Sequence, residues 1–98
     1  MPSFHVVADV SSDDPGALRP VLEEFVSGAL TELPEGFHID GVAAGDDVRH
    51  ANRALLSALR RAERRTRMRA EWADGDVVHR FFDYVPKGTR PAAQGTGQ

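Results

Sequence analysis

The chain has 98 residues, of which 41% are hydrophobic and 28% are charged, a composition typical of one compact globular domain. It contains no cysteine, which excludes disulfides, thiolate metal sites and cysteine nucleophiles. No apolar run approaches the roughly 20 residues that a membrane-spanning helix needs, and the N-terminus lacks the features of a signal peptide, so we expect a cytoplasmic protein without membrane contact.

The net charge of −3 conceals a strong asymmetry along the chain. Residues 1–47 carry ten carboxylates and one arginine, whereas residues 48–98 carry eleven basic residues and five carboxylates. Such a distribution indicates an anionic partner or head-to-tail self-association. It also fits two halves of one chain that lie side by side and neutralise each other.

Two strands and two helices are predicted before the arginine-rich part of the chain. Residues 4–10 alternate in polarity as a strand does, and residues 37–43 form a second, shorter strand. Between them, an apolar stripe at helical spacing predicts a helix over residues 18–33, after a turn over residues 15–18. A second helix is predicted over residues 48–65, with an alanine-rich buried stripe.

A β-hairpin is predicted next. Asp74-Gly75 lies between two strand-like runs, residues 66–72 and residues 77–85. Asp-Gly between alternating runs favours a two-residue type I′ turn, because both central residues of that turn need a positive φ. The segment 86–98 has no apolar period, and we expect it to be a disordered C-terminal tail.

The two-residue turn sets the pairing within the hairpin. Trp72 is expected opposite Val77, on the side of the hairpin that faces the helices. On the other side, Arg69 is expected directly opposite Arg80, where the two like charges repel. His79 shares the helix-facing side and is expected to be buried.

These elements predict an α/β fold, a two-layer sandwich within residues 1–85. Its four-stranded mixed sheet carries both helices on one face, with the first two strands parallel and the hairpin at the C-terminal end. The order of elements resembles the core of the thioredoxin fold without its last helix. The resemblance implies topology alone, because Ser11-Ser12-Asp13-Asp14 stands where a Cys-x-x-Cys motif would precede the first helix.

An arginine-dense stretch is a candidate binding site. Six arginines fall within ten residues, and a seventh joins them across the hairpin: Arg60, Arg61, Arg64, Arg65, Arg67, Arg69 and Arg80. The planar guanidinium suits phosphate, and such clustering is typical of nucleic-acid or other polyanion binding. The alternatives are a solvated face, a face that forms ion pairs with the acidic N-terminal half of the sequence, and a subunit contact.

The sheet face away from the helices is the second candidate. It is expected to expose a partly apolar surface made of His5, Val7, His38, Val78, Phe82 and Tyr84. An exposed face of this kind predicts contact with another protein, and a homodimer is the simplest case. If the first two strands adjoin, His5 and His38 lie in register near Asp9 and Asp40, an arrangement that suits acid–base chemistry.

The sequence therefore predicts a small non-catalytic interaction module that self-associates through its open sheet face. Two alternatives stay open: nucleic-acid or polyanion binding through the arginine-dense stretch, and a small enzyme with a histidine–aspartate site on the sheet. No metal or cofactor is predicted, because the aspartates at 13–14 and 46–47 are expected to cap the two helices.

Overall fold

The computed structural model of this chain describes residues 2–91. Its elements in chain order are β1 (Ser3–Ser11), the 3₁₀ helix η1 (Pro15–Leu18), α1 (Arg19–Phe25), β2 (Ser27–Leu33), β3 (Gly36–Ala44), α2 (Val48–Ala62), β4 (Arg67–Asp74), β5 (Val77–Phe82) and β6 (Val85–Pro91). The predictions of β1, β3 and α2 are confirmed to within a few residues at each end.

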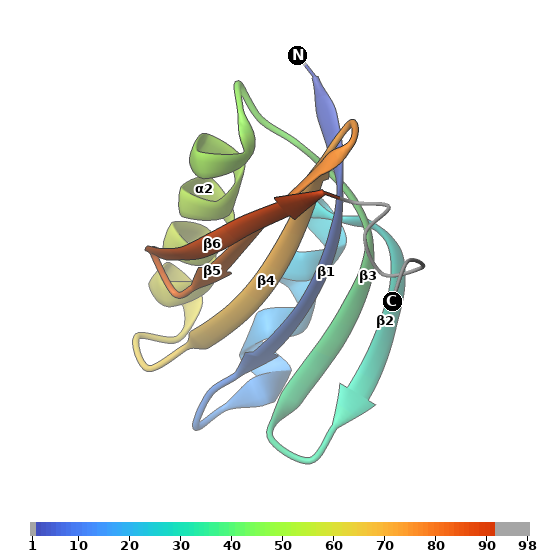
Figure 1. Cartoon of the computed structure of the whole chain (residues 1–98). Coiled ribbons are helices and arrows are strands. Elements are labelled where there is room, and N and C mark those ends of the chain that lie inside the picture. The colour runs from blue at the N-terminus through green and yellow to red at the C-terminus, as the bar shows by residue number, and fades with distance from the viewer. Residues whose placement is uncertain (1, 92–98) are drawn as a thin grey trace.

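The six strands form one antiparallel sheet in the order β2-β3-β1-β4-β5-β6. Both α-helices lie on the same side of this sheet, so the opposite side carries no helix (Figure 1). The succession from β1 to β4, with one helix after β1 and one after β3, is a split β-α-β arrangement, and β5 and β6 extend it. The prediction of a two-layer fold with strands and helices is confirmed at this level.

The four-stranded mixed sheet is wrong, because the second half of the predicted first helix is a strand. Helix α1 ends at Phe25, and Gly28 follows with a φ of 155°, far outside the helical region. Residues 27–33 then run as β2 along β3. Strand β3 therefore returns antiparallel to β1, and the topology departs from the thioredoxin core.

The hairpin is confirmed, but its register differs from the prediction by two residues. Asp74 pairs with Val77, so the two turn residues are Gly75 and Asp76. Only the first of them has a positive φ, 61° at Gly75, the pattern of a type II′ turn rather than type I′.

The shift changes the partners but not the faces, because two residues is one full period of a strand. Trp72 lies opposite His79 instead of Val77 and still points to the helices, fully buried. The predicted pairing of Arg69 with Arg80 is wrong: Arg80 lies opposite Glu71, which removes the expected charge repulsion.

The predicted tail is wrong for residues 86–91. Asp83 has a φ of 56° and turns the chain back after β5, and β6 then pairs antiparallel with β5. The remainder of that tail, residues 92–98, lies outside the described residues.

The core lies between the sheet and the helices. Its fully buried side chains come from all layers and include Val6, Val10, Leu18, Leu22, Ile39, Leu55, Leu56, Leu59, Met68 and Trp72. Within the part of the chain that the structure describes, no helix is long and apolar enough to cross a membrane.

Candidate interaction surface on the open sheet face

Strand alternation and the observed register place two groups of charged side chains on the face without helices. On β1 and β3, two aspartates and two histidines form what we call the acidic half: His5, Asp9, His38 and Asp40. On β4, β5 and β6, five cations form what we call the basic half: Arg67, Arg69, Arg80, Lys87 and Arg90. Glu71 lies within the basic half, where its Oε1 accepts a hydrogen bond from Arg90 at 3.1 Å.

The two histidines do not come together. Because β1 and β3 are antiparallel, His5 lies opposite Val42 and His38 lies opposite Asp9. His38 Nδ1 is 2.7 Å from Asp9 Oδ1, and His5 Nε2 is 2.7 Å from Asp40 Oδ1. The expected proximity of histidines and aspartates therefore holds as two separate pairs, whereas the expected register between His5 and His38 is wrong.

Arg67 and Arg69 flank an aromatic ring on this face. Their guanidinium carbons lie 5.1 and 5.8 Å from the centre of the Phe82 ring, within the range of cation–π contact. Arg67 Nε also donates to Asp83 Oδ2 at 2.9 Å, which fixes its position. Arg69 makes no hydrogen bond or ion pair with any other residue that the structure describes.

The seven arginines of the sequence cluster do not share one surface. Arg60 lies on the helix side, where its Nε donates to Thr66 O at 2.9 Å. Arg65 reaches Asp13 at 3.8 Å near the end of α2, and the exposed Arg61 and Arg64 lie in the same region. Of the predicted set, three residues remain on the open face: Arg67, Arg69 and Arg80.

Tyr84 is also not where it was expected. It follows the turn residue Asp83, and its hydroxyl lies 3.2 Å from Ser57 Oγ of α2, on the helix side of the sheet. The guanidinium of Arg60 stacks on its ring at 5.1 Å. The placement of Tyr84 on the open face is therefore wrong, since the chain reverses one residue earlier.

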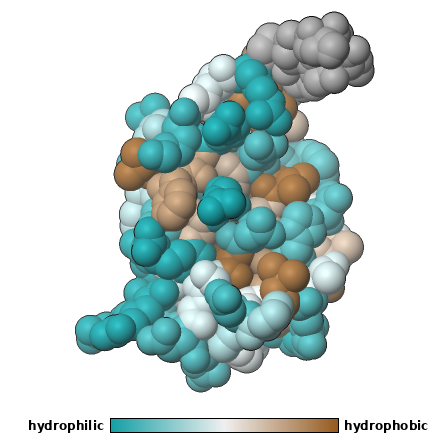
Figure 2. Space-filling model, turned by 60° about the horizontal axis from the view of Figure 1, so that its bottom comes forward, coloured by the Kyte–Doolittle hydropathy of each residue, from teal (hydrophilic) through white to brown (hydrophobic). Residues whose placement is uncertain are grey.

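The open face is less apolar than predicted. Val7, Val78 and Phe82 lie on it as expected, but each is half-buried among charged neighbours. On the side of the molecule that Figure 2 shows, hydrophobic residues form small separate patches between hydrophilic ones. The character of the surface is thus ionic, with limited apolar area.

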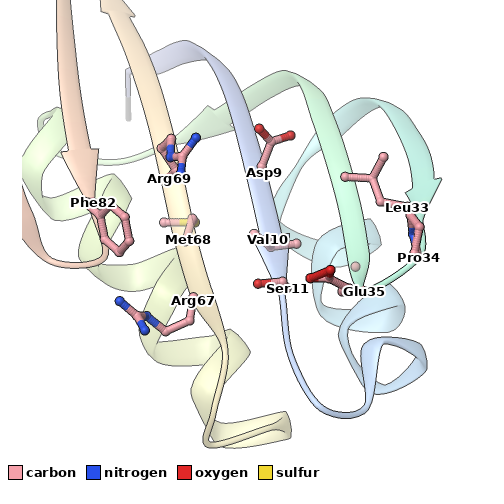
Figure 3. Close-up of a pocket in the computed structure, with 11 residues that line it drawn as sticks. Asp9, Val10, Ser11, Leu33, Pro34, Glu35, Arg67, Met68, Arg69 and Phe82 are labelled. Atoms are coloured by element: carbon pink, nitrogen blue, oxygen red, sulfur yellow. The ribbon is translucent and has the colours of Figure 1, made fainter.

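Two adjoining depressions mark this surface. The first, of about 370 Å³, lies where β1, β4 and the β2–β3 turn meet, with Arg67, Arg69 and Phe82 on one side and Leu33 and Glu35 on the other (Figure 3). The second, of about 390 Å³, lies over β1, β4 and β5. Both are lined by three shared residues: Asp9, Arg69 and Phe82.

Sequence reasoning missed the contribution of Lys87 and Arg90, because β6 was predicted as tail. Pro86 and Gly88 disfavour a strand, and only Val85 and Thr89 give a weak signal for one. Pairing with β5 overrides these propensities.

The expectation that aspartates cap both helices is wrong for the first, since the side chain of Asp14 makes no capping hydrogen bond to η1. Asp47 Oδ1 accepts a hydrogen bond from the backbone N–H of His50 at 2.8 Å, which confirms it as the N-cap of α2. This bond, followed by the one to the His50 side chain, lowers the pKa of Asp47. Among the described residues, no group of three or more histidine or acidic side chains is placed to hold a metal ion.

Arg19 on α1 is the one arginine or lysine of residues 1–47, and it contacts glutamates on two elements. It donates to Glu32 at 2.9 Å and to Glu23 at 3.4 Å, and these hydrogen bonds raise its pKa.

Comparison with known proteins gives no guide to function, since no protein-family model, no curated protein and no solved structure matches this chain. The function is inferred from the charge and shape of the open face.

Proposed function

We propose that this protein is a non-catalytic interaction module that self-associates through the open face of its sheet, with the basic half of one copy on the acidic half of the other. The observation that carries the proposal is the division of this face into two halves of opposite charge, which meet between the two central strands β1 and β4.

The register makes the two halves complementary at two charged pairs, although the same arrangement sets Val7 against the partner's Glu71. Asp9 on β1 is paired with Arg69 on β4. In the cross-strand row two residues along, Asp40 on β3 and Arg80 on β5 lie one strand further out on either side of the line between β1 and β4. Two copies can pack face to face about a twofold axis that is parallel to the strands and passes above the line between β1 and β4. This axis places the basic half of one copy over the acidic half of the other. It therefore sets Arg69 against the partner's Asp9 and Arg80 against the partner's Asp40.

One apolar pair of the face supports the same packing. In this arrangement Val78 faces the partner's Val42, and Phe82 faces the partner's His38. Val42 is 42% exposed in the single chain, so contact with Val78 would remove apolar surface from water. Ionic contacts supply orientation and association rate more than affinity, so we expect a moderate, salt-sensitive dimer.

The proposal is tested by sedimentation of two charge-reversed variants. The first is Arg69→Glu with Arg80→Glu, which makes the basic half acidic, and the second is Asp9→Lys with Asp40→Lys, which makes the acidic half basic. Each variant alone is expected to be monomeric, and an equal mixture is expected to form a heterodimer. Arg53→Glu, an exposed change on α2, is the matched control and should dimerise like the native chain.

Two results contradict the proposal. One is a native chain that stays monomeric at high micromolar concentration in low salt. The other is a native dimer that both variants still form unaided, since the dimer would then use another surface.

A second candidate function is the binding of single-stranded nucleic acid across the basic half. It is favoured by the position of Arg67 and Arg69 on the Phe82 ring, since cations beside an aromatic side chain on an open sheet suit phosphates and bases. Arg67→Glu with Arg69→Glu should then abolish binding of a mixed-sequence oligonucleotide. A binding constant that does not change with salt would exclude this function.

A further inference from the structure

The depression over β1, β4 and β5 has the size of a small-molecule site. Its volume of about 390 Å³ falls within the range of roughly 300–1,000 Å³ that is usual for ligand pockets. Side chains from four strands line it, with Val7 and Phe82 as its apolar part and Lys87 from β6 at its rim.

Three cations line this depression, and one of them, Arg69, also contacts the Phe82 ring at 5.8 Å. Arg69, Arg80 and Lys87 form no hydrogen bond or ion pair with any side chain of the chain between residues 2 and 91. They come from three adjacent strands, β4, β5 and β6, and therefore line the same side of the depression. Asp9 and Glu71 lie opposite Arg69 and Arg80 on the neighbouring strands but form no ion pair with them, so these cations are available to an anion.

The two carboxylates that line the same depression make contacts outside it. Asp9 is paired with His38 at 2.7 Å, and Glu71 accepts from Arg90 at 3.1 Å. Both partners lie outside the lining of the depression. Both carboxylates thus contact partners outside the lining, and the lining as a whole carries one net positive charge.

The apolar part sets the class of ligand. Val7 and Phe82 are half-buried and lie beside the cations, so an acid group alone would leave this apolar surface in contact with water. The neighbouring depression shares Phe82 and Arg69 and adds Leu33, which gives room for an extended apolar body.

We infer that this depression binds a small organic anion: its acid group is held by Arg69, Arg80 and Lys87, and its apolar or aromatic body lies on Val7 and Phe82. This inference does not require self-association. In the dimer proposed above, two of these cations, Arg69 and Arg80, face the partner's aspartates, so ligand and second copy compete for one surface.

The test is a titration of the full-length chain with phenyl phosphate, followed by the amide shifts of a two-dimensional NMR spectrum. The protein is kept at a concentration where sedimentation shows a monomer, so that failure of the dimer and failure of the ligand site are seen separately. We expect shifts confined to residues 7–9, 69–71, 80–82 and 87. Phenyl phosphate should bind at least tenfold more tightly than inorganic phosphate, and benzylamine should not bind.

Variants locate the site. Arg69→Gln with Arg80→Gln should weaken phenyl phosphate binding at least tenfold and leave the remaining spectrum in place, whereas the control Arg53→Gln should bind like the native chain. Equal binding of phenyl phosphate and inorganic phosphate would overturn the apolar part of the inference. Shifts scattered over the surface, or an unchanged affinity in the double variant, would overturn the site itself.

Discussion

The indole Nε1 of Trp72 donates a hydrogen bond to the side-chain oxygen of Asn52, 3.0 Å away in the interior of the molecule. Both residues are almost fully buried. The side-chain nitrogen of Asn52 in turn donates to the backbone carbonyl of Asp83 at 2.9 Å. One amide on α2 thus connects strand β4 to the turn that starts β6, and it satisfies a polar group on each.

Replacement of Asn52 by leucine should destabilise the fold strongly. The substitution keeps the branching and the number of heavy atoms of the side chain but leaves the Trp72 N–H and the Asp83 carbonyl without partners, at a cost of about 2–4 kcal/mol in the free energy of unfolding. Urea denaturation followed by the fluorescence of Trp72, the single tryptophan of the chain, measures this directly. The exposed neighbour Arg53→Leu is the control, and equal stability of the two variants would contradict the prediction.

Asp83 should tolerate asparagine far better than alanine. Its carboxylate accepts from the Met68 backbone N–H at 2.8 Å and from Arg67 Nε at 2.9 Å, and its φ of 56° is one that alanine adopts only with strain. We expect a loss of about 1 kcal/mol for Asp83→Asn and about 3 kcal/mol for Asp83→Ala, measured by thermal denaturation.

Asp83→Gly separates the two contributions to that loss. Glycine removes the carboxylate but takes up a positive φ without strain, so it should be more stable than the alanine variant by about 1 kcal/mol. Identical stabilities for glycine and alanine would mean that the backbone conformation at residue 83 costs nothing.

Most of the fold was predictable, because its strands and its long helix have strong periodicity. β1 has apolar residues at every second position from Phe4 to Val10, and α2 has a regular apolar stripe that ends close to the predicted residue. Residues 27–33 were not predictable, since Ala29 and Leu33 continue the helical spacing of the preceding apolar residues and also share one face of a strand. Gly28 was the local signal against the helix, and pairing with β3 decided the outcome.

The open face was predictable only in part. Face assignments depend on the parity of a residue within its strand, so Val7 and Phe82 were placed correctly even though the hairpin register was wrong by two. Tyr84 was misplaced because nothing in the sequence marks Asp83 as a residue with positive φ. The charge pairs of the face depend on the antiparallel return of β3, which followed from the missed strand β2.

The N-cap of α2 predicts a pH-dependent stability. The pKa of Asp47 is lower in the folded chain than in the unfolded chain, so the unfolded chain binds more protons in the window between the two values. The carboxylate therefore stabilises the fold above its unfolded pKa, and this contribution disappears as the pH falls through its folded pKa.

Asp47→Asn isolates this effect, because asparagine also caps a helix but does not titrate in this range. Thermal denaturation should show the native chain as the more stable protein at neutral pH, and the difference should vanish in acid. A difference between the two proteins that is the same at both pH values would contradict the assignment. High salt should shrink the difference at neutral pH, since Asp47 is exposed.

Gly36 should be the least replaceable glycine at the edge of the candidate surface. It lies where β3 begins beside the end of β1, and a Cβ at this position would lie 1.8 Å from the carbonyl oxygen of Val10. That oxygen belongs to the backbone of a central strand and cannot move aside without breaking the pairing of β1 with β3 or β4.

Gly36→Ala should therefore cost about 3 kcal/mol in the free energy of unfolding. Gly16→Ala is the matched control, because a Cβ there meets only Asp14 Oδ1 at 3.8 Å and its effect should stay within about 0.5 kcal/mol. Urea denaturation of the two variants measures the contrast. If Gly36→Ala proved as stable as Gly16→Ala, β1 and β3 would have to pack less closely at this end of the sheet, and the depression beside Gly36 would be wider than the structure has it.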